Sequence, residues 1–210
     1  MYEAQGVRGP GRVLHHFLPD EYLEAAAARG DRRPEAQPYF LYVGRLAAVK
    51  GVGPLLEYFA RGTSPAPLYL AGDGPLEGAL KRRYRDHPAI RFLGRQSQED
   101  LGPLYRDALA LILPSAGYEI YGQVVLESFA HGTLAVVTDV AGASEFIEAS
   151  GAGHVYRSDD DLASALSTLA GDSGLRNASG RQGRDYLGRE HGEAQYVDRY
   201  EALIRERRDR

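Results

Sequence analysis

Residues 109–137 read LALILPSAGYEIYGQVVLESFAHGTLAVV, and this stretch decides the fold class. Its opening apolar run, 109–113, is typical of a strand that is buried on both faces of a parallel sheet. A helix is predicted over 122–131, and the apolar run 134–137 predicts the next strand. Two parallel strands joined through a helix form a βαβ unit, which indicates an α/β fold.

The same alternation of strands and helices extends to both sides of this unit. Ser97 and Ser158 have the pattern of helix-capping residues, and Leu104 and Tyr105 are expected on the inner face of the helix after Ser97. We therefore expect one Rossmann-like parallel sheet flanked by helices, with ligands bound outside the carboxyl ends of its strands. The other expected elements are strands at 39–43, 68–71, 90–93 and 153–156, and helices near 52–59, 75–84, 158–169, 173–188 and 193–207.

Composition excludes several classes of protein. The 210 residues are 43% hydrophobic with a net charge of −4, which is unlike a disordered chain or a basic nucleic-acid-binding domain. The longest apolar run, 108–113, is far shorter than the roughly 20 residues of a membrane span. With no signal-peptide pattern and no Cys, we expect a cytoplasmic chain.

Residues 1–38 do not share the rhythm of the remaining chain. Glycines and prolines are frequent here, and we expect a short strand near 12–15 and a helical turn at 20–28. We interpret 1–38 as a linker of the kind found between domains, and 39–210 as the folded domain.

The loop after the first expected strand combines cations with glycines. Gly44 and Arg45 begin it, and Lys50 and Gly51 end it. A strand-to-helix junction of this composition predicts a phosphate site, with backbone N–H groups and two positive side chains. An Arg and a Lys in a solvated surface loop would give the same pattern.

The loop after the second expected strand, 72–78, contains three glycines. The third is one residue too late for a dinucleotide-binding motif. Gly72 and Gly74 therefore indicate either a tight turn beside a ligand or a plain turn.

Two glutamates flank the start of the helix at 122–131. Glu119 precedes this helix and Glu127 lies within it. Gly122 at the helix start leaves the N–H groups of Gln123 and Val124 free to meet an anion. Glu127 can accept hydrogen bonds from ribose hydroxyls. The alternative is a capping carboxylate followed by an exposed helix glutamate.

The spacing of Glu119 and Glu127 resembles the E-x7-E motif of retaining family-four glycosyltransferases, which have the GT-B architecture of two Rossmann-like domains. The resemblance covers residues from about Tyr39 to the C-terminus and lacks a counterpart for the N-terminal acceptor domain. Tyr121 stands where Phe is usual, and Ala141 replaces a Gly. Four further segments resemble the family in the expected order: Gly44-Arg45 with Lys50-Gly51, Gly72 to Pro75, Phe92 to Arg95, and Gly142 with Glu145.

The resemblance implies a role for each matching residue. Arg45 and Lys50 would bind the donor diphosphate and stabilise the leaving group, and Glu119 would contact the donor sugar as the third catalytic residue. Glu127 would hold the ribose hydroxyls. The implied donor-binding set is Gly44, Arg45, Lys50, Gly72, Gly94, Arg95, Glu119, Gly122, Gln123, Val124 and Glu127, with Gly94 and Arg95 framing the base. No metal and no prosthetic group is implied.

We therefore expect the C-terminal, donor-binding half of a retaining hexosyltransferase that uses a UDP- or GDP-sugar. The chain alone should be poorly active or inactive, and an acceptor-binding domain or partner subunit should complete it. Contact with a membrane is expected only through that absent domain, and contact with nucleic acid is not expected. The alternatives are a non-catalytic module that binds nucleotide-sugar or docks on a partner, and an enzyme of nucleotide-sugar epimerisation or phosphorolysis.

Overall fold

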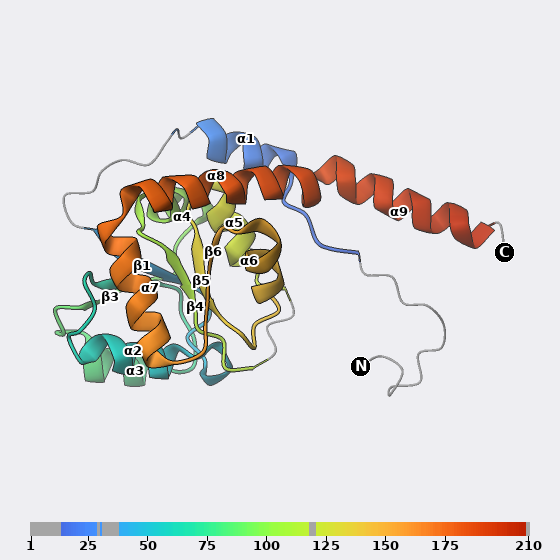
Figure 1. The fold of residues 1–210 in the computed structure, drawn as a ribbon. Helices are drawn as coiled ribbons and strands as arrows, with labels where there is room; N and C mark the ends of the chain where they lie inside the picture. The colour runs from blue at the N-terminus through green and yellow to red at the C-terminus, as the bar shows by residue number, and fades with distance from the viewer. Residues whose placement is uncertain (1–13, 29, 31–37, 118–120, 209–210) are drawn as a thin grey trace.

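Six parallel strands form one sheet in a computed structural model that describes residues 14–28, 30, 38–117 and 121–208 (Figure 1). The strand order is β3-β2-β1-β4-β5-β6, so the direction of winding reverses between β1 and β4. This confirms the predicted Rossmann-like sheet. Sheets of this kind bind ligands at the carboxyl ends of the strands beside the reversal, which here are β1 and β4. The strands are β1 (Phe40–Val43), β2 (Leu68–Ala71), β3 (Ile90–Gly94), β4 (Leu111–Leu113), β5 (Ala135–Thr138) and β6 (Gly153–Tyr156).

Helices cover both faces of the sheet. Leu41 and Leu113 belong to the core cluster shared with α4, α5, α6 and α8, whereas Phe40 and Ile112 belong to the cluster shared with α2, α3 and α7. Both faces are buried in the central strands β1, β4 and β5, which explains their apolar sequences, whereas the edge strands β3 and β6 are partly exposed. The helices are α1 (Asp20–Ala28), α2 (Val52–Ala60), α3 (Glu77–Tyr84), α4 (Gln98–Asp107), α5 (Gln123–Ala130), α6 (Ser144–Ser150), α7 (Asp159–Gly171), α8 (Ser173–Glu190) and α9 (Glu193–Arg208).

The helix starts confirm two of the predicted caps. The Ser97 hydroxyl accepts a hydrogen bond from the Asp100 N–H at 3.2 Å, and Ser158 accepts one from Asp161 at 3.1 Å. Helix α6 was not predicted, because its seven residues give too short an apolar repeat. The strand expected near 12–15 falls partly outside the described residues, and Leu14 and His15 belong to no strand.

The segment 14–28 packs against the domain. Leu18 and Ala26 are each 2% exposed and belong to the core cluster on the α5 side of the sheet. The Leu18 N–H donates to the His191 carbonyl at 3.2 Å, which joins this segment to the junction between α8 and α9. Leu23 of α1 and Leu187 of α8 line a common cavity, and the two helices lie on the same side of the molecule in Figure 1. The segment is therefore part of the packed structure of the domain.

Helix α9 extends away from the globular body (Figure 1). Val197, Tyr200 and Ile204, spaced three and four residues apart, are 44%, 51% and 41% exposed. These positions share one face of the helix and leave apolar surface uncovered. Within the part of the chain that the structure describes, no helix is both long enough and apolar enough to cross a membrane.

Candidate functional site

The loops after β1 and β4 meet at the switch point of the sheet. The Ala116 N–H donates to the Val49 carbonyl at 3.1 Å. Gly51 has φ +66°, and a Cβ atom there would lie 1.6 Å from the Pro114 carbonyl oxygen. Only glycine permits this approach of the two backbones. The packing keeps Lys50, which ends the short 3₁₀ turn Ala48–Lys50, beside the start of the β4 loop.

The glycines after β2 accommodate the β1 loop. A Cβ atom at Gly72 would lie 2.0 Å from the Gly44 carbonyl oxygen, and one at Gly74 would lie 2.6 Å from the Leu46 carbonyl oxygen. The Leu46 N–H also donates to the Asp73 carbonyl at 2.7 Å. The structure thus favours a turn whose glycines allow backbone packing, and that packing fixes the loop that contains Arg45. Ligand binding by Gly44 and Gly72 stays a prediction.

Gly94 and Arg95 lie at the carboxyl end of β3, two strands from β1. The Gly72 N–H donates to the Gly94 carbonyl at 2.8 Å, and the Arg95 side chain is exposed. Two strand spacings amount to about 10 Å, which is the scale on which a base and its diphosphate are separated. Their role in framing a base stays a prediction.

Helix α5 begins at the same switch point. Gly122 is its N-cap, with φ +68°, and a Cβ atom there would lie 2.7 Å from the Ala143 Cβ. The first N–H groups of a helix have no acceptor within it, and here they belong to Gln123 and Val124. Glu119 lies outside the described residues, so its contact with a donor sugar stays a prediction.

Tyr121 joins the start of α5 to two distant segments. Its hydroxyl donates to the His16 carbonyl and lies 2.9 Å from His191 Nδ1, which is 3.0 Å from the same carbonyl. The pattern is satisfied when His191 carries its proton on Nδ1 and Tyr121 donates to His16. Burial lowers the pKa of His191 and raises the pKa of Tyr121, which favours the neutral form of each ring.

Glu127 is a buried residue of α5. The residue is only 8% exposed, and its Oε2 accepts a hydrogen bond from the Tyr105 hydroxyl at 2.8 Å. Burial raises the pKa of Glu127, whereas hydrogen bonds from Tyr105 and Gln123 lower it. The alternative of an exposed helix glutamate is therefore wrong. The sequence predicts Tyr105 only as an inner-face core residue, because no local pattern marks a hydroxyl partner 22 residues away on another helix.

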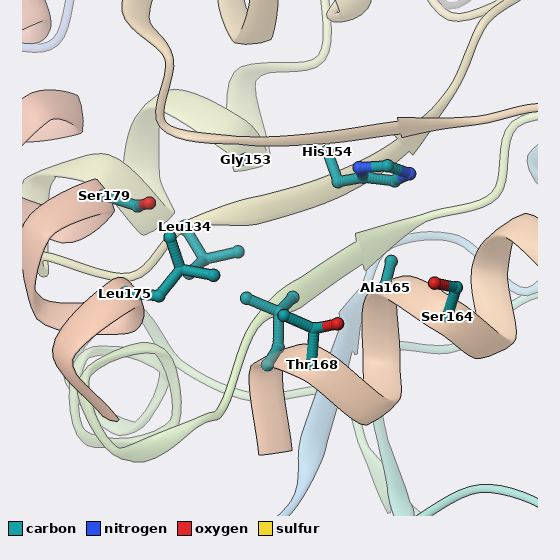
Figure 2. A pocket seen from close by; sticks show the side chains of 9 residues that line it. Leu134, Gly153, His154, Ser164, Ala165, Thr168, Leu175 and Ser179 are labelled. Atoms are coloured by element: carbon teal, nitrogen blue, oxygen red, sulfur yellow. The ribbon is translucent and has the colours of Figure 1, made fainter. Parts of the chain in front are cut away.

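Two cavities lie at opposite edges of the sheet. One of about 250 Å³ is at the carboxyl edge, where Gly51, Ser115 and Thr138 contribute to its lining. The other, of about 160 Å³, lies at the amino ends of β5 and β6, against α7 and α8, with Leu134 and Thr168 among its lining residues (Figure 2). A third cavity, of about 370 Å³, lies between α1, α5 and α8, with Ala130 and Leu187 among its lining residues. The second and third are remote from the switch-point loops, whereas the first borders them at Gly51 and Pro114.

Known proteins are similar to this chain in sequence and in fold. Residues 37–172 match the model of the family described as Glycosyl transferases group 1. The glycogen synthase of Mycobacterium tuberculosis is 33% identical over 165 residues, which are 74% of this chain and 40% of that protein.

Solved structures extend the comparison to nearly the whole chain. The sucrose-phosphate synthase of Thermosynechococcus elongatus superposes with a TM-score of 0.76 at 23% identity, over 95% of this chain and 53% of that one. Anabaena Alr3699/HepE in complex with UDP and glucose gives 0.70 at 17% identity, over 91% of this chain and 53% of that one. The chain spans about half the length of these proteins, or less. Its family match and its parallel sheet show that it belongs to the group 1 glycosyltransferases, with the fold of one Rossmann-like half of a GT-B enzyme.

Proposed function

We propose that this chain is the donor-binding domain of a retaining glycosyltransferase that moves a hexose from a UDP- or GDP-sugar. The observation that carries the proposal is the meeting of the β1 and β4 loops at the switch point. There the loop containing Arg45 and Lys50 adjoins the loop that leads into α5. The cations of the first loop and the first N–H groups of α5 therefore lie at the carboxyl end of the sheet, and Glu127 follows in the next turn of α5.

Arg45 and Lys50 act on the diphosphate in this proposal. When the bond from the sugar to the diphosphate breaks, negative charge grows on the departing phosphate oxygen. Fixed cations stabilise that charge, and they act more strongly on the transition state than on the bound donor. The N–H groups of Gln123 and Val124 add the positive end of a helix dipole. Glu119 contacts the sugar beside the reacting carbon.

Glu127 and the β3 end recognise the nucleoside. The Glu127 carboxylate accepts hydrogen bonds from the ribose hydroxyls, while Gly94 and Arg95 frame the base. Alr3699/HepE, which shares the fold, is described in complex with UDP and glucose, and this supports UDP as the first nucleotide to test.

A second domain or subunit completes the enzyme in this proposal. The chain covers only 40% of the glycogen synthase that it matches, and α9 presents apolar side chains at Val197, Tyr200 and Ile204 without covering them. An acceptor-binding partner would cover this helix, close the cleft and exclude water. Residues 1–38 would lead to it, with 14–28 packed on the present domain, and the chain alone would transfer sugar poorly. The absence of Cys suits a cytoplasmic location.

Calorimetric titration of the chain with UDP, GDP and ADP tests the donor site. We expect saturable binding of UDP or GDP. Glu127→Ala should weaken it by roughly 1.5–3 kcal/mol, because a carboxylate that accepts ligand hydrogen bonds is lost. Glu57→Ala is the matched control, since Glu57 is exposed on α2 and pairs only at the surface with Arg83.

Two results would contradict the proposal. One is the absence of binding by all three nucleotides to a folded chain. The other is an affinity that Glu127→Ala leaves equal to that of Glu57→Ala. Binding that persists without transfer after an acceptor domain is supplied would favour the docking-module alternative.

A further inference from the structure

We infer that Tyr105 is a positioning residue for ribose recognition, because its phenol holds the Glu127 carboxylate in the one orientation from which it can accept the ribose hydroxyls. The inference rests on the proposed function, since it assumes that a nucleotide binds at the switch point. It adds a residue on α4 to a site whose other residues lie in the strand-end loops and on α5.

The Tyr105 ring is fixed from several sides. The residue is fully buried, and its hydroxyl donates to Glu127 Oε2 at 2.8 Å. The Tyr105 carbonyl accepts a hydrogen bond from the Thr133 hydroxyl at 2.6 Å. The ring stacks on His131, with centroids 5.8 Å apart and planes 8° from parallel. A phenol held in this way cannot follow the carboxylate to another rotamer, so it determines where Oε2 lies.

The chemistry of the pair suits hydroxyl recognition. The groups that hydrogen-bond Glu127, the Tyr105 phenol and the Gln123 side chain, are both neutral. A carboxylate has about four acceptor positions, and a phenol fills one of them. Neutral donors also leave the negative charge unneutralised, so the remaining positions stay strong acceptors for further hydroxyls. Vicinal hydroxyls of a ribose are donors of this kind.

Packing alone does not account for the pair. Burial raises the pKa of Glu127, which means that the folded chain loses stability by keeping this carboxylate ionised. Apolar side chains at positions 105 and 127 would fill the same space without that loss. The hydrogen bond from Tyr105 offsets part of this loss of stability. In return, the pair holds the carboxylate in one orientation.

The test compares two ligands that differ only in the ribose hydroxyls, UDP and 2′,3′-dideoxy-UDP. We expect Tyr105→Phe to lower the affinity for UDP about tenfold and to change the affinity for the dideoxy analogue less than twofold. The preference for UDP over the analogue should fall in Glu127→Ala too, and the double variant should be no weaker than Glu127→Ala alone. Tyr39→Phe is the matched control, because it removes a buried phenol that bonds the Leu104 carbonyl at 2.9 Å and leaves Glu127 untouched.

Each other outcome is decisive. Equal losses for both ligands in Tyr105→Phe would show a merely structural role and overturn the inference. The inference would also be overturned if Tyr105→Phe left the affinity for UDP unchanged while Glu127→Ala weakened it. The proposed function would stand in that case. No nucleotide binding by the parent chain would contradict the proposed function itself. If Tyr105→Phe does not fold, Tyr105→Leu carries the test, because leucine has no donor, and a preference for UDP equal to that of the parent would overturn the inference.

Discussion

The two sides of the switch point are built in different ways. On the β1 side, the backbone of the 44–51 loop is fixed by glycines at which no side chain fits, such as Gly51 and Gly72. On the α5 side, side-chain hydroxyls of Tyr105 and Tyr121 fix the helix to α4, to the segment at His16 and to the α8–α9 junction. We therefore expect a substitution on the β1 side to disrupt the backbone of the loop. A substitution on the α5 side should only change how side chains near the start of the helix are positioned.

The largest effect is expected at Gly51. Gly51→Ala puts a Cβ atom 1.6 Å from the Pro114 carbonyl oxygen and forces a left-handed φ on alanine. We expect a loss of about 3–5 kcal/mol in the free energy of unfolding. Urea denaturation followed by circular dichroism measures it.

Gly53→Ala is the control for this variant. Gly53 lies in α2 two residues further on, and a Cβ atom there would meet nothing within 4 Å. Alanine should raise the free energy of unfolding by about 0.5–1 kcal/mol. Similar midpoints for the two variants would show that the backbone contact between the loops does not fix the β1 side.

A smaller effect separates what the two sides recognise. Arg45→Ala should weaken the binding of UDP by about 1.5–3 kcal/mol and leave the binding of uridine unchanged, because in the proposed site the lost charge would face only the diphosphate. Glu127→Ala should weaken both ligands. Titration of each variant with UDP and with uridine measures the contrast. An Arg45→Ala variant that lost uridine affinity to the same degree would contradict the division of roles.

The smallest effect is expected at Tyr121. Tyr121→Phe restores the side chain that the family resemblance expects and removes only the hydroxyl between His16 and His191. We expect a loss of about 1 kcal/mol in the free energy of unfolding, the contribution of one hydrogen bond. Tyr200→Phe, at an exposed position on α9, should change it by less than about 0.5 kcal/mol. Equal free energies of unfolding for Tyr121→Phe and Tyr200→Phe would mean that the Tyr121 hydroxyl does not stabilise the fold.

The sequence predicted most of the fold because both faces of the sheet are buried. A strand covered on two sides must be apolar throughout, so the run at 68–71 predicted β2 with its observed bounds. Strand β6 lies at the edge of the sheet and is only half buried, and its observed bounds are those expected at 153–156. The helices near 173–188 and 193–207 are confirmed as α8 and α9. Helix α6 was missed, since Phe146 and Ile147 are its only buried side chains and are adjacent, which gives no helical repeat.

Local pattern predicted the backbone features of the candidate site, whereas its tertiary contacts were missed. Gly122 as the start of α5 and the loop from Gly44 to Gly51 follow from residues close in sequence. The burial of Glu127 depends on Tyr105, and the fixing of Tyr121 depends on residues 70 and 105 positions away. No periodicity encodes such pairs, so only the folded chain reveals them.

A crystal structure of the chain with UDP tests the central claim most directly. The account predicts the diphosphate between the loop of Arg45 and Lys50 and the first N–H groups of α5, with the ribose hydroxyls on Glu127. UDP bound elsewhere, for example in the cavity lined by Leu134 and Thr168 at the amino edge of the sheet, would contradict it.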